Sequence, residues 1–250
     1  MVSIFFVKMV FMCKKAIIVG ASSGIGESLA KIMSAKGYIL GLTGRRVDLL
    51  EALAGELPEK AVVQVMDVSK VLDAEEQFSN LIQNLGKVDL VIIAAGTGQQ
   101  NLELESALEV ETINTNVIGF TIIAGMAFNH FKNNQKGHLV GISSIMALRG
   151  SSDAPAYSAS KAYISNYMQG LRVKAFKEKL DVTITDIRPG FVDTAMAKGD
   201  GLFWVSSPEK AALQIFDAIE AGKSCAYITK RWRLIAWFLK VLPESLYRKL

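Results

Sequence analysis

Short hydrophobic runs alternate along the chain with longer segments in which hydrophobic residues recur at helical spacing. The run Leu90-Val91-Ile92-Ile93 is apolar at every position, as expected for a strand that helices cover on both faces. Strands that alternate with helices in this way form βαβ units and a parallel sheet. We therefore predict an α/β fold with a doubly wound, mostly seven-stranded parallel sheet and helices on both faces. Its strands are expected at 16–19, 38–43, 61–66, 88–94, 138–143, 182–187 and 225–228.

The length and composition agree with a single domain that has a large core. The chain has 250 residues, half of them are hydrophobic, and the net charge is +4. These values exclude a disordered acidic or basic chain, and they provide no basic stripe suited to nucleic acid. We predict one domain at 14–230, between an N-terminal extension at 1–13 and a basic amphipathic segment at 231–250.

Cysteine and histidine are too sparse to suggest a metal or disulfide site. Cys13 and Cys225 are the two cysteines, and they lie far apart in the sequence. The histidines, His130 and His138, have no cysteine or acidic residues at ligand spacing and are interpreted as ordinary surface residues. We predict no metal site and expect a reducing, cytoplasmic location.

The first twelve residues are mostly apolar and contain one charged residue, Lys8. They are shorter than a membrane span and lack a small-residue cleavage site, so they do not read as a signal peptide. Two interpretations stay open, a flexible extension or a translation start at Met9 or Met12.

A glycine-rich turn follows the first predicted strand and opens an amphipathic run at 25–36. Glycine lets the chain turn sharply and lets backbone N–H groups approach phosphate oxygens, while the helix N-terminus adds a partial positive charge. The turn therefore predicts the pyrophosphate site of a Rossmann-type dinucleotide-binding fold, although the motif alone also fits a plain structural turn. Its candidate contacts are Gly20, Ser22, Ser23, Gly24, Ile25 and Gly26.

A second set of residues lies in the later part of the chain. Ser144 precedes Tyr157 by thirteen residues, and Lys161 follows that tyrosine by four. With the glycine-rich turn, the segment Asn116-Val117-Ile118-Gly119 and the pair Pro189-Gly190, this order resembles the short-chain dehydrogenase/reductase family. The resemblance runs from about Lys14 to Tyr227. It implies an oxidoreductase with a nicotinamide cofactor, acting on a small carbonyl or alcohol substrate as a homodimer or homotetramer.

The end of the second predicted strand bears on which nicotinamide cofactor is used. An acidic residue there would bind a free ribose 2′-hydroxyl and repel a 2′-phosphate. This chain has Thr43-Gly44-Arg45-Arg46 instead, and guanidinium groups bind phosphate well. We predict NADP(H). The alternative is that Arg45 and Arg46 only solvate the start of a helix, one of them paired with Asp48.

Further cofactor contacts are implied by the resemblance. Asp67 would bind the adenine amino group, although a structural capping role is also open. The family commonly has Asn-Asn-Ala-Gly after the fourth strand, whereas this chain has Ile93-Ala94-Ala95-Gly96, and Val19 replaces a threonine. We interpret these departures as changes in the support of the sheet. The implied contacts are Asp67, Val68, Ala95, Gly96, Tyr157, Lys161, Pro189, Gly190, Val192 and Thr194.

Hydride transfer to a carbonyl carbon requires a proton at the oxygen. Tyr157 and Lys161 lie one helical turn apart and so share one helix face, where the ammonium can lower the pKa of the phenol. By resemblance, Tyr157 is the general acid and base and Ser144 holds the substrate oxygen. Asn116 would bind a water that relays protons towards Lys161.

Residues 231–242 combine aliphatic and tryptophan side chains with basic residues. Arg233, Ala236 and Lys240 are expected on one helical face. The segment would pack on the domain or a second subunit, cover a lipophilic substrate, or make peripheral membrane contact.

The loops 147–154 and 196–204 are rich in apolar residues, including Met196, Leu202, Phe203 and Trp204, and favour a hydrophobic ketone. Two alternatives stay open, a non-catalytic NADP(H)-binding sensor or scaffold, and a membrane-associated reductase of a lipid-linked keto group.

Overall fold

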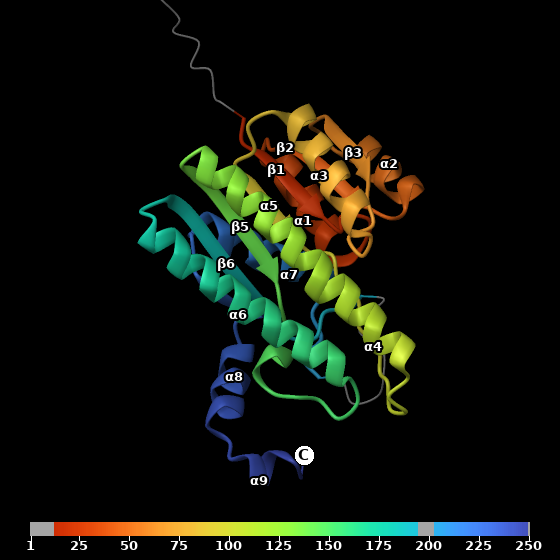
Figure 1. Ribbon diagram of the computed structural model, residues 1–250, viewed down its shortest axis with the longest axis vertical. Helices are drawn as coiled ribbons and strands as arrows, with labels where there is room; N and C mark the ends of the chain where they lie inside the picture. Colours follow the sequence, from red (N-terminus) through yellow and green to blue (C-terminus); the bar gives the residue numbers. More distant parts are fainter. Residues whose placement is uncertain (1–12, 195–202, 250) are drawn as a thin grey trace, which may run out of the picture.

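The computed structural model describes residues 13–194 and 203–249. Seven parallel strands form one sheet in the order β3-β2-β1-β4-β5-β6-β7 (Figure 1). The doubly wound fold predicted from the hydrophobic pattern is confirmed, and every predicted strand is present. The strands are β1 (Lys15–Val19), β2 (Ile39–Gly44), β3 (Ala61–Val65), β4 (Leu90–Ile93), β5 (Lys136–Ile142), β6 (Asp181–Pro189) and β7 (Cys225–Ile228).

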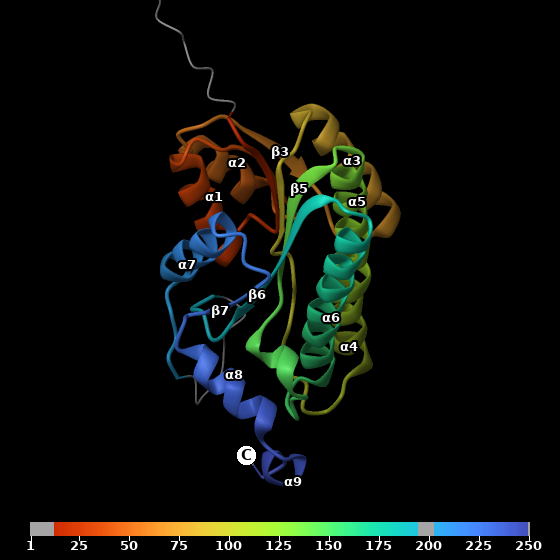
Figure 2. The same cartoon turned by 90° about the vertical axis from the view of Figure 1, so that its left-hand side faces the viewer.

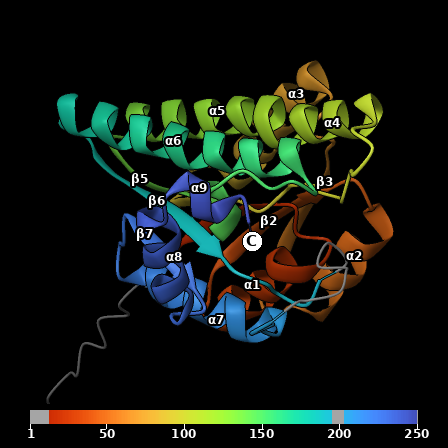
Figure 3. The ribbon, with the colours of Figure 1, turned by 90° about the horizontal axis from the view of Figure 1, so that it is seen from below.

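Helices cover both faces of the sheet, as Figures 2 and 3 show. One face carries α1 (Gly24–Ala35), α2 (Val47–Glu56) and α7 (Pro208–Glu220). The other carries α3 (Val71–Leu85), α5 (Phe120–Asn133) and α6 (Pro155–Lys177). The remaining elements are α4 (Ser106–Ile113), the π-helix η1 (Asn114–Gly119), the 3₁₀ helix η2 (Ile145–Leu148), α8 (Trp232–Val241) and α9 (Glu244–Tyr247).

The central strands explain why their sequences are apolar at every position. Side chains alternate between the faces of a strand. Ile18 and Ile92 belong to the core beneath α1 and α7, whereas Ile17 and Val91 belong to the core beneath α3 and α5. Both sets are fully buried. The sheet therefore lies between two hydrophobic cores, as the pattern indicates.

Main-chain hydrogen bonds tie together the segments that leave β1, β2 and β4. Gly20 N donates to Thr43 O at 2.8 Å, and Ala95 N donates to Val19 O at 2.7 Å. These main-chain bonds join the strand ends. Positions 19 and 94 carry valine and alanine in place of the polar side chains that the resemblance implies, and the bonds do not need those side chains. The crevice between β1 and β4 is the point at which strand order reverses, where ligands bind in such folds.

The helix α8 follows β7 and packs on the domain through Trp232 and Ala236, each 2% exposed. It continues through a short link into α9, and both extend from the body of the molecule (Figures 1 and 2). Within residues 13–194 and 203–249, no helix combines the length and hydrophobicity that a membrane crossing requires.

Candidate active site

A cavity of about 810 Å³ opens at the carboxyl ends of the strands. It is formed by the segments that follow β1 to β6, together with α6. Of the predicted site residues, Gly24 and Asn116 do not line it. Those that do are Gly20, Ser22, Ser23, Ile25, Gly26, Arg45, Arg46, Asp67, Val68, Ala95, Gly96, Ser144, Tyr157, Lys161, Pro189, Gly190, Val192 and Thr194.

The glycine-rich turn forms one end of the cavity. Gly20 has a φ of 88° and Gly24 a φ of 60°, in the left-handed region that side chains disfavour. A Cβ on Gly26 would lie 2.0 Å from Gly20 O, and one on Gly24 would lie 3.1 Å from Thr194 Cγ2. Gly24 is the first residue of α1, so a helix N-terminus faces this end. The backbone therefore fits the pyrophosphate of a dinucleotide, which would be held by exposed N–H groups and the helix dipole.

Arg46 brings positive charge to the same turn. Its Nη2 donates to Ser22 Oγ at 2.8 Å and to Ser23 Oγ at 2.7 Å. Gly44 offers no side chain in the place of an acid. Among the residues that the structure describes, no ion pair joins Arg46 to Asp48; the guanidinium is instead held at the glycine-rich turn by the two serine hydroxyls.

Asp67 lies at the end of β3 and caps its own turn. Its Oδ1 accepts from Ser69 N at 3.0 Å and from Ser69 Oγ at 2.7 Å. Asp67 therefore has the structural capping role in this structure, whereas its contact with the adenine of a bound cofactor stays a prediction. Next to it, a Cβ on Gly119 would lie 2.5 Å from Val68 O, which explains the glycine of the Asn-x-x-Gly segment by a close backbone approach.

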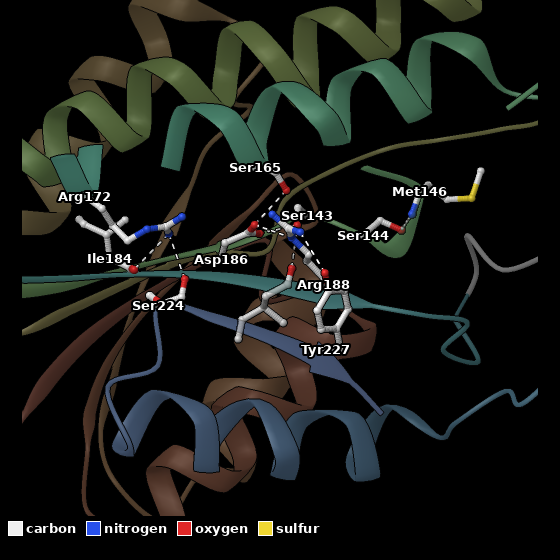
Figure 4. Close-up of polar contacts among 11 residues, drawn as sticks. Ser143, Ser144, Met146, Ser165, Arg172, Ile184, Asp186, Arg188, Ser224 and Tyr227 are labelled. Carbon is white, nitrogen blue, oxygen red and sulfur yellow. Dashed lines mark hydrogen bonds and ion pairs between the residues drawn. The ribbon is translucent and has the colours of Figure 1, made fainter. Parts of the chain in front are cut away.

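The proton-transfer residues gather around the end of β5. Lys161 Nζ lies 5.5 Å from the centre of the Tyr157 ring and donates to Ile142 O at 3.1 Å. Ser144 is the second residue after β5, and its Oγ accepts from Met146 N at 3.1 Å, which caps η2 (Figure 4). The Tyr157 ring packs on Gly98, where a Cβ would lie 2.2 Å from Cδ2.

Burial sets the protonation states at this point. It raises the pKa of the Tyr157 phenol, and the contact with the Ser144 hydroxyl partly opposes that rise. Burial lowers the pKa of Lys161 to about 8, and the charge of Asp186 partly opposes that fall. At neutral pH the tyrosine is therefore a neutral proton donor beside a mostly charged ammonium.

Asn116 is fully buried behind the cavity wall in the π-helix η1. Its Oδ1 accepts from Thr97 N at 2.8 Å, and its Nδ2 donates to Thr97 O at 2.7 Å and to Ser160 Oγ at 3.0 Å. The side chain thus holds the segment that carries Gly98 against Tyr157. The water relay expected of Asn116 stays a prediction.

A buried polar network behind Ser144 was not found from the sequence. Asp186 in β6 is fully buried and accepts from Ser143 Oγ at 2.5 Å, Ser165 Oγ at 2.9 Å and Arg188 Nε at 2.8 Å (Figure 4). Ser143 precedes Ser144, and Ser165 lies one helical turn after Lys161. The carboxylate therefore joins the elements that carry both residues. The sequence contains one signal for this network. Asp186 lies inside the apolar stretch 182–187, and Arg188 directly follows that stretch.

Across the described part of the chain, histidine, cysteine and acidic side chains do not gather in threes that could hold a metal ion. The absence of a metal site remains a sequence prediction.

Comparison with known proteins identifies relatives of the whole arrangement. A family profile described as short chain dehydrogenase matches residues 14–201. A 3-oxoacyl-[acyl-carrier-protein] reductase from Bos taurus is 31% identical over 189 residues, which cover 75% of this chain and 79% of the relative. An uncharacterized oxidoreductase from Myxococcus xanthus is 32% identical over 248 residues and 94% of each chain.

Solved structures share the fold. A short-chain dehydrogenase from Streptomyces avermitilis has a TM-score of 0.81 at 21% identity, covering 95% of this chain and 94% of its own. An alcohol dehydrogenase from Thermococcus sibiricus, complexed with 5-hydroxy-NADP, has a TM-score of 0.75 at 25% identity, covering 86% and 96%. Together with the glycine-rich turn and the grouped Ser144, Tyr157 and Lys161, these matches establish that the chain is an oxidoreductase of the short-chain dehydrogenase/reductase family.

Proposed function

We propose that the protein is an NADP(H)-dependent reductase or dehydrogenase that interconverts a hydrophobic ketone and a secondary alcohol. The observation that carries the proposal is the shared cavity. Ser144, Tyr157 and Lys161 line one part of it, and the glycine-rich turn with Arg46 lines another. A dinucleotide that extends from the turn would bring its nicotinamide towards the tyrosine.

The preference for NADP(H) rests on the end of β2. Gly44 leaves space where an acid would repel a 2′-phosphate, and Arg46 is held at the turn by two serine hydroxyls. Arg45 lines the cavity beside it. The Thermococcus sibiricus relative was solved with an NADP derivative, which agrees with this preference.

The chain's own residues supply the proton and the orientation. The reduced cofactor, when bound, supplies the hydride to the carbonyl carbon. Ser144 donates a hydrogen bond to the carbonyl oxygen, and Tyr157 gives it a proton. Lys161 keeps positive charge near the phenol and so stabilises the phenolate that forms. In alcohol oxidation the phenolate accepts the proton.

The substrate end of the cavity has an apolar wall, to which Ile145, Met146 and Phe191 contribute. Phe203 packs against Phe191 with ring centres 5.8 Å apart. Met196 and Leu202 of the predicted substrate loop lie outside the described residues. The Bos taurus relative is named for a 3-oxoacyl substrate, a keto group on an acyl chain, and this name supports a lipophilic ketone.

The test is oxidation of NADPH and NADH by the purified protein with ketones of increasing chain length. We expect turnover with NADPH, and a loss of about a hundredfold to ten-thousandfold in Tyr157→Phe with cofactor binding retained. Tight NADPH binding without turnover above the Tyr157→Phe background would instead favour the sensor or scaffold alternative.

A cytoplasmic location and a homodimer or homotetramer remain part of the proposal. Sedimentation velocity of the full chain, with and without NADPH, measures the assembly. A monomer at all concentrations would contradict it.

A further inference from the structure

The helix α8 has an apolar face on each side. Trp232, Ile235, Ala236 and Leu239 face the domain, spaced as expected for one side of a helix. Leu234, Trp237, Phe238 and Val241 form a second row with the same spacing, and we call this row the outer stripe. Its members are 70%, 67%, 46% and 57% exposed. Large apolar side chains are thus presented away from the domain in one continuous row.

Basic residues border the outer stripe. Arg233 and Lys240 lie on the flank between the two apolar faces, and both are exposed. In 230–249, Glu244 is the one acidic residue. The basic residues of that segment are Lys230, Arg231, Arg233, Lys240, Arg248 and Lys249. The segment that carries the stripe therefore has six basic residues and one acidic residue, a balance that favours an anionic partner.

The helix is firmly attached to the domain. Trp232 is seated on Gly190, where a Cβ would lie 2.0 Å from the indole Cε2. Arg149 Nε donates to Leu239 O at 2.8 Å, and Arg149 Nη2 donates to Leu242 O. Tyr247 OH donates to Gly150 O at 2.6 Å. The outer stripe is therefore held in a defined orientation on a braced helix.

We propose that the outer stripe and its basic flank dock the protein on the surface of an anionic lipid membrane. Tryptophan, phenylalanine and aliphatic side chains enter the boundary between headgroups and acyl chains, and lysine or arginine beside them attract anionic headgroups. With ten residues, α8 is too short to cross a bilayer, so it lies in the plane of the surface.

A second copy of the chain fits this surface less well. A twofold contact through the outer stripe would bring Arg233 and Lys240 near the same residues of the other copy. Neither the inner row nor the outer stripe of α8 contains an acidic residue that could pair with these basic side chains, so like charges would repel each other across the contact. Anionic headgroups remove that repulsion.

The inner row of α8, on the side of the helix opposite the outer stripe, lies next to the proposed substrate end of the cavity. Phe191 lines the cavity and contacts Trp232 with ring centres 5.4 Å apart. A docked α8 would therefore bring this end close to the membrane surface. This consequence for substrate delivery rests on the proposed function, whereas membrane docking does not.

The test is cosedimentation of the full chain with vesicles of phosphatidylcholine mixed with phosphatidylglycerol, compared with pure phosphatidylcholine. We expect binding to the mixed vesicles that weakens with salt. Trp237→Ser with Phe238→Ser should reduce the partition coefficient by about tenfold or more. The matched control, Leu72→Ser with Phe176→Ser, removes side chains that are 81% and 85% exposed on α3 and α6 and should leave binding unchanged.

A second variant, Arg233→Gln with Lys240→Gln, keeps the apolar stripe and should lose about fivefold per charge. Circular dichroism and NADPH binding show whether each variant is folded. The proposal is overturned if the full chain does not bind the mixed vesicles, or if the Trp237→Ser/Phe238→Ser protein binds them as the parent does. The latter result would indicate another segment, such as residues 1–12. A dimer that the same substitutions dissociate, without vesicle binding, would overturn it in favour of a second copy.

Discussion

The buried pair of Asp186 and Arg188 allows a quantitative prediction about the support of the active site. Asp186 is fully buried, and the side chain of Arg188 is 15% exposed. Removal of one partner from a buried ion pair costs about 3–5 kcal/mol, because the other charge is left uncompensated. Arg188 also donates to Tyr227 OH at 3.1 Å and keeps some contact with water, so we take the lower end of the range.

We therefore expect Asp186→Asn to lower the free energy of unfolding by about 3 kcal/mol, measured by urea denaturation. Asparagine has a similar shape, so the change tests charge more than volume. The variant Asp186→Leu with Arg188→Met removes both charges, and it should lose less stability than the sum of the two single substitutions. A cost below about 1 kcal/mol for Asp186→Asn would refute the reasoning, because it would mean that the pair is effectively solvated.

The same substitution provides a second readout at Lys161. Asp186 opposes the fall in the Lys161 pKa that burial causes, so its loss lowers this pKa below the parent value of about 8. The ammonium then loses its proton at a lower pH. The alkaline limb of the kcat/KM profile for ketone reduction should shift towards neutral pH in Asp186→Asn. A purely structural role would leave the limb in place.

Three further predictions concern the cavity. In the parent protein, kcat/KM for reduction should be steady at neutral pH and fall as pH rises through about 8, because Lys161 then becomes neutral. If the alkaline limb of this profile is unchanged in Lys161→Arg, the limb belongs to another group. Gly98→Ala would place a Cβ 2.2 Å from Tyr157 Cδ2, so the ring must shift. We expect kcat to fall while NADPH binding, measured by fluorescence, is retained. A kcat equal to that of the parent would show that the ring tolerates the shift. Arg46→Ala should weaken NADPH binding by about tenfold or more and change NADH binding little. The reason is that a charge-assisted hydrogen bond to phosphate is worth about 1.5–3 kcal/mol. Equal losses for both cofactors would indicate that Arg46 acts at the pyrophosphate instead.

The sheet could be predicted from the sequence because each strand carries its own signal. Apolar runs such as 90–93 require cover on both faces, wherever the rest of the chain lies. The cap Ser207 before Pro208 is equally local, and its Oγ accepts from Lys210 N at 3.3 Å. The glycine-rich turn and the Tyr157 segment could be found because their spacing is fixed within a few residues.

Contacts between distant elements could not be found in that way. Ser143, Ser165 and Arg188 meet at Asp186 only when β5, β6 and α6 are assembled. The need for glycine at position 98 likewise depends on a tyrosine ring 59 residues later in the chain.

Two interpretations of single residues were wrong for the same reason. His138 was expected at the surface, but it is only half-exposed, because β6 lies beside it. Its Nε2 is 2.8 Å from Thr185 Oγ1, and burial lowers its pKa to about 4. Ala236 was grouped with Arg233 and Lys240 on one face of the C-terminal helix, but it is buried, because the side that faces the domain extends from Trp232 to Ala236.

The seating of Trp232 on Gly190 links the C-terminal helix to the wall of the cavity. The family profile ends at residue 201, yet a tryptophan beyond that limit supports the Pro189–Gly190 segment that the profile includes. The inner row of α8 thus supports a segment that lines the cavity, whereas substitutions in the outer row would leave that support in place. The surface of this short helix can therefore be altered by substitution without disturbing the wall of the cavity.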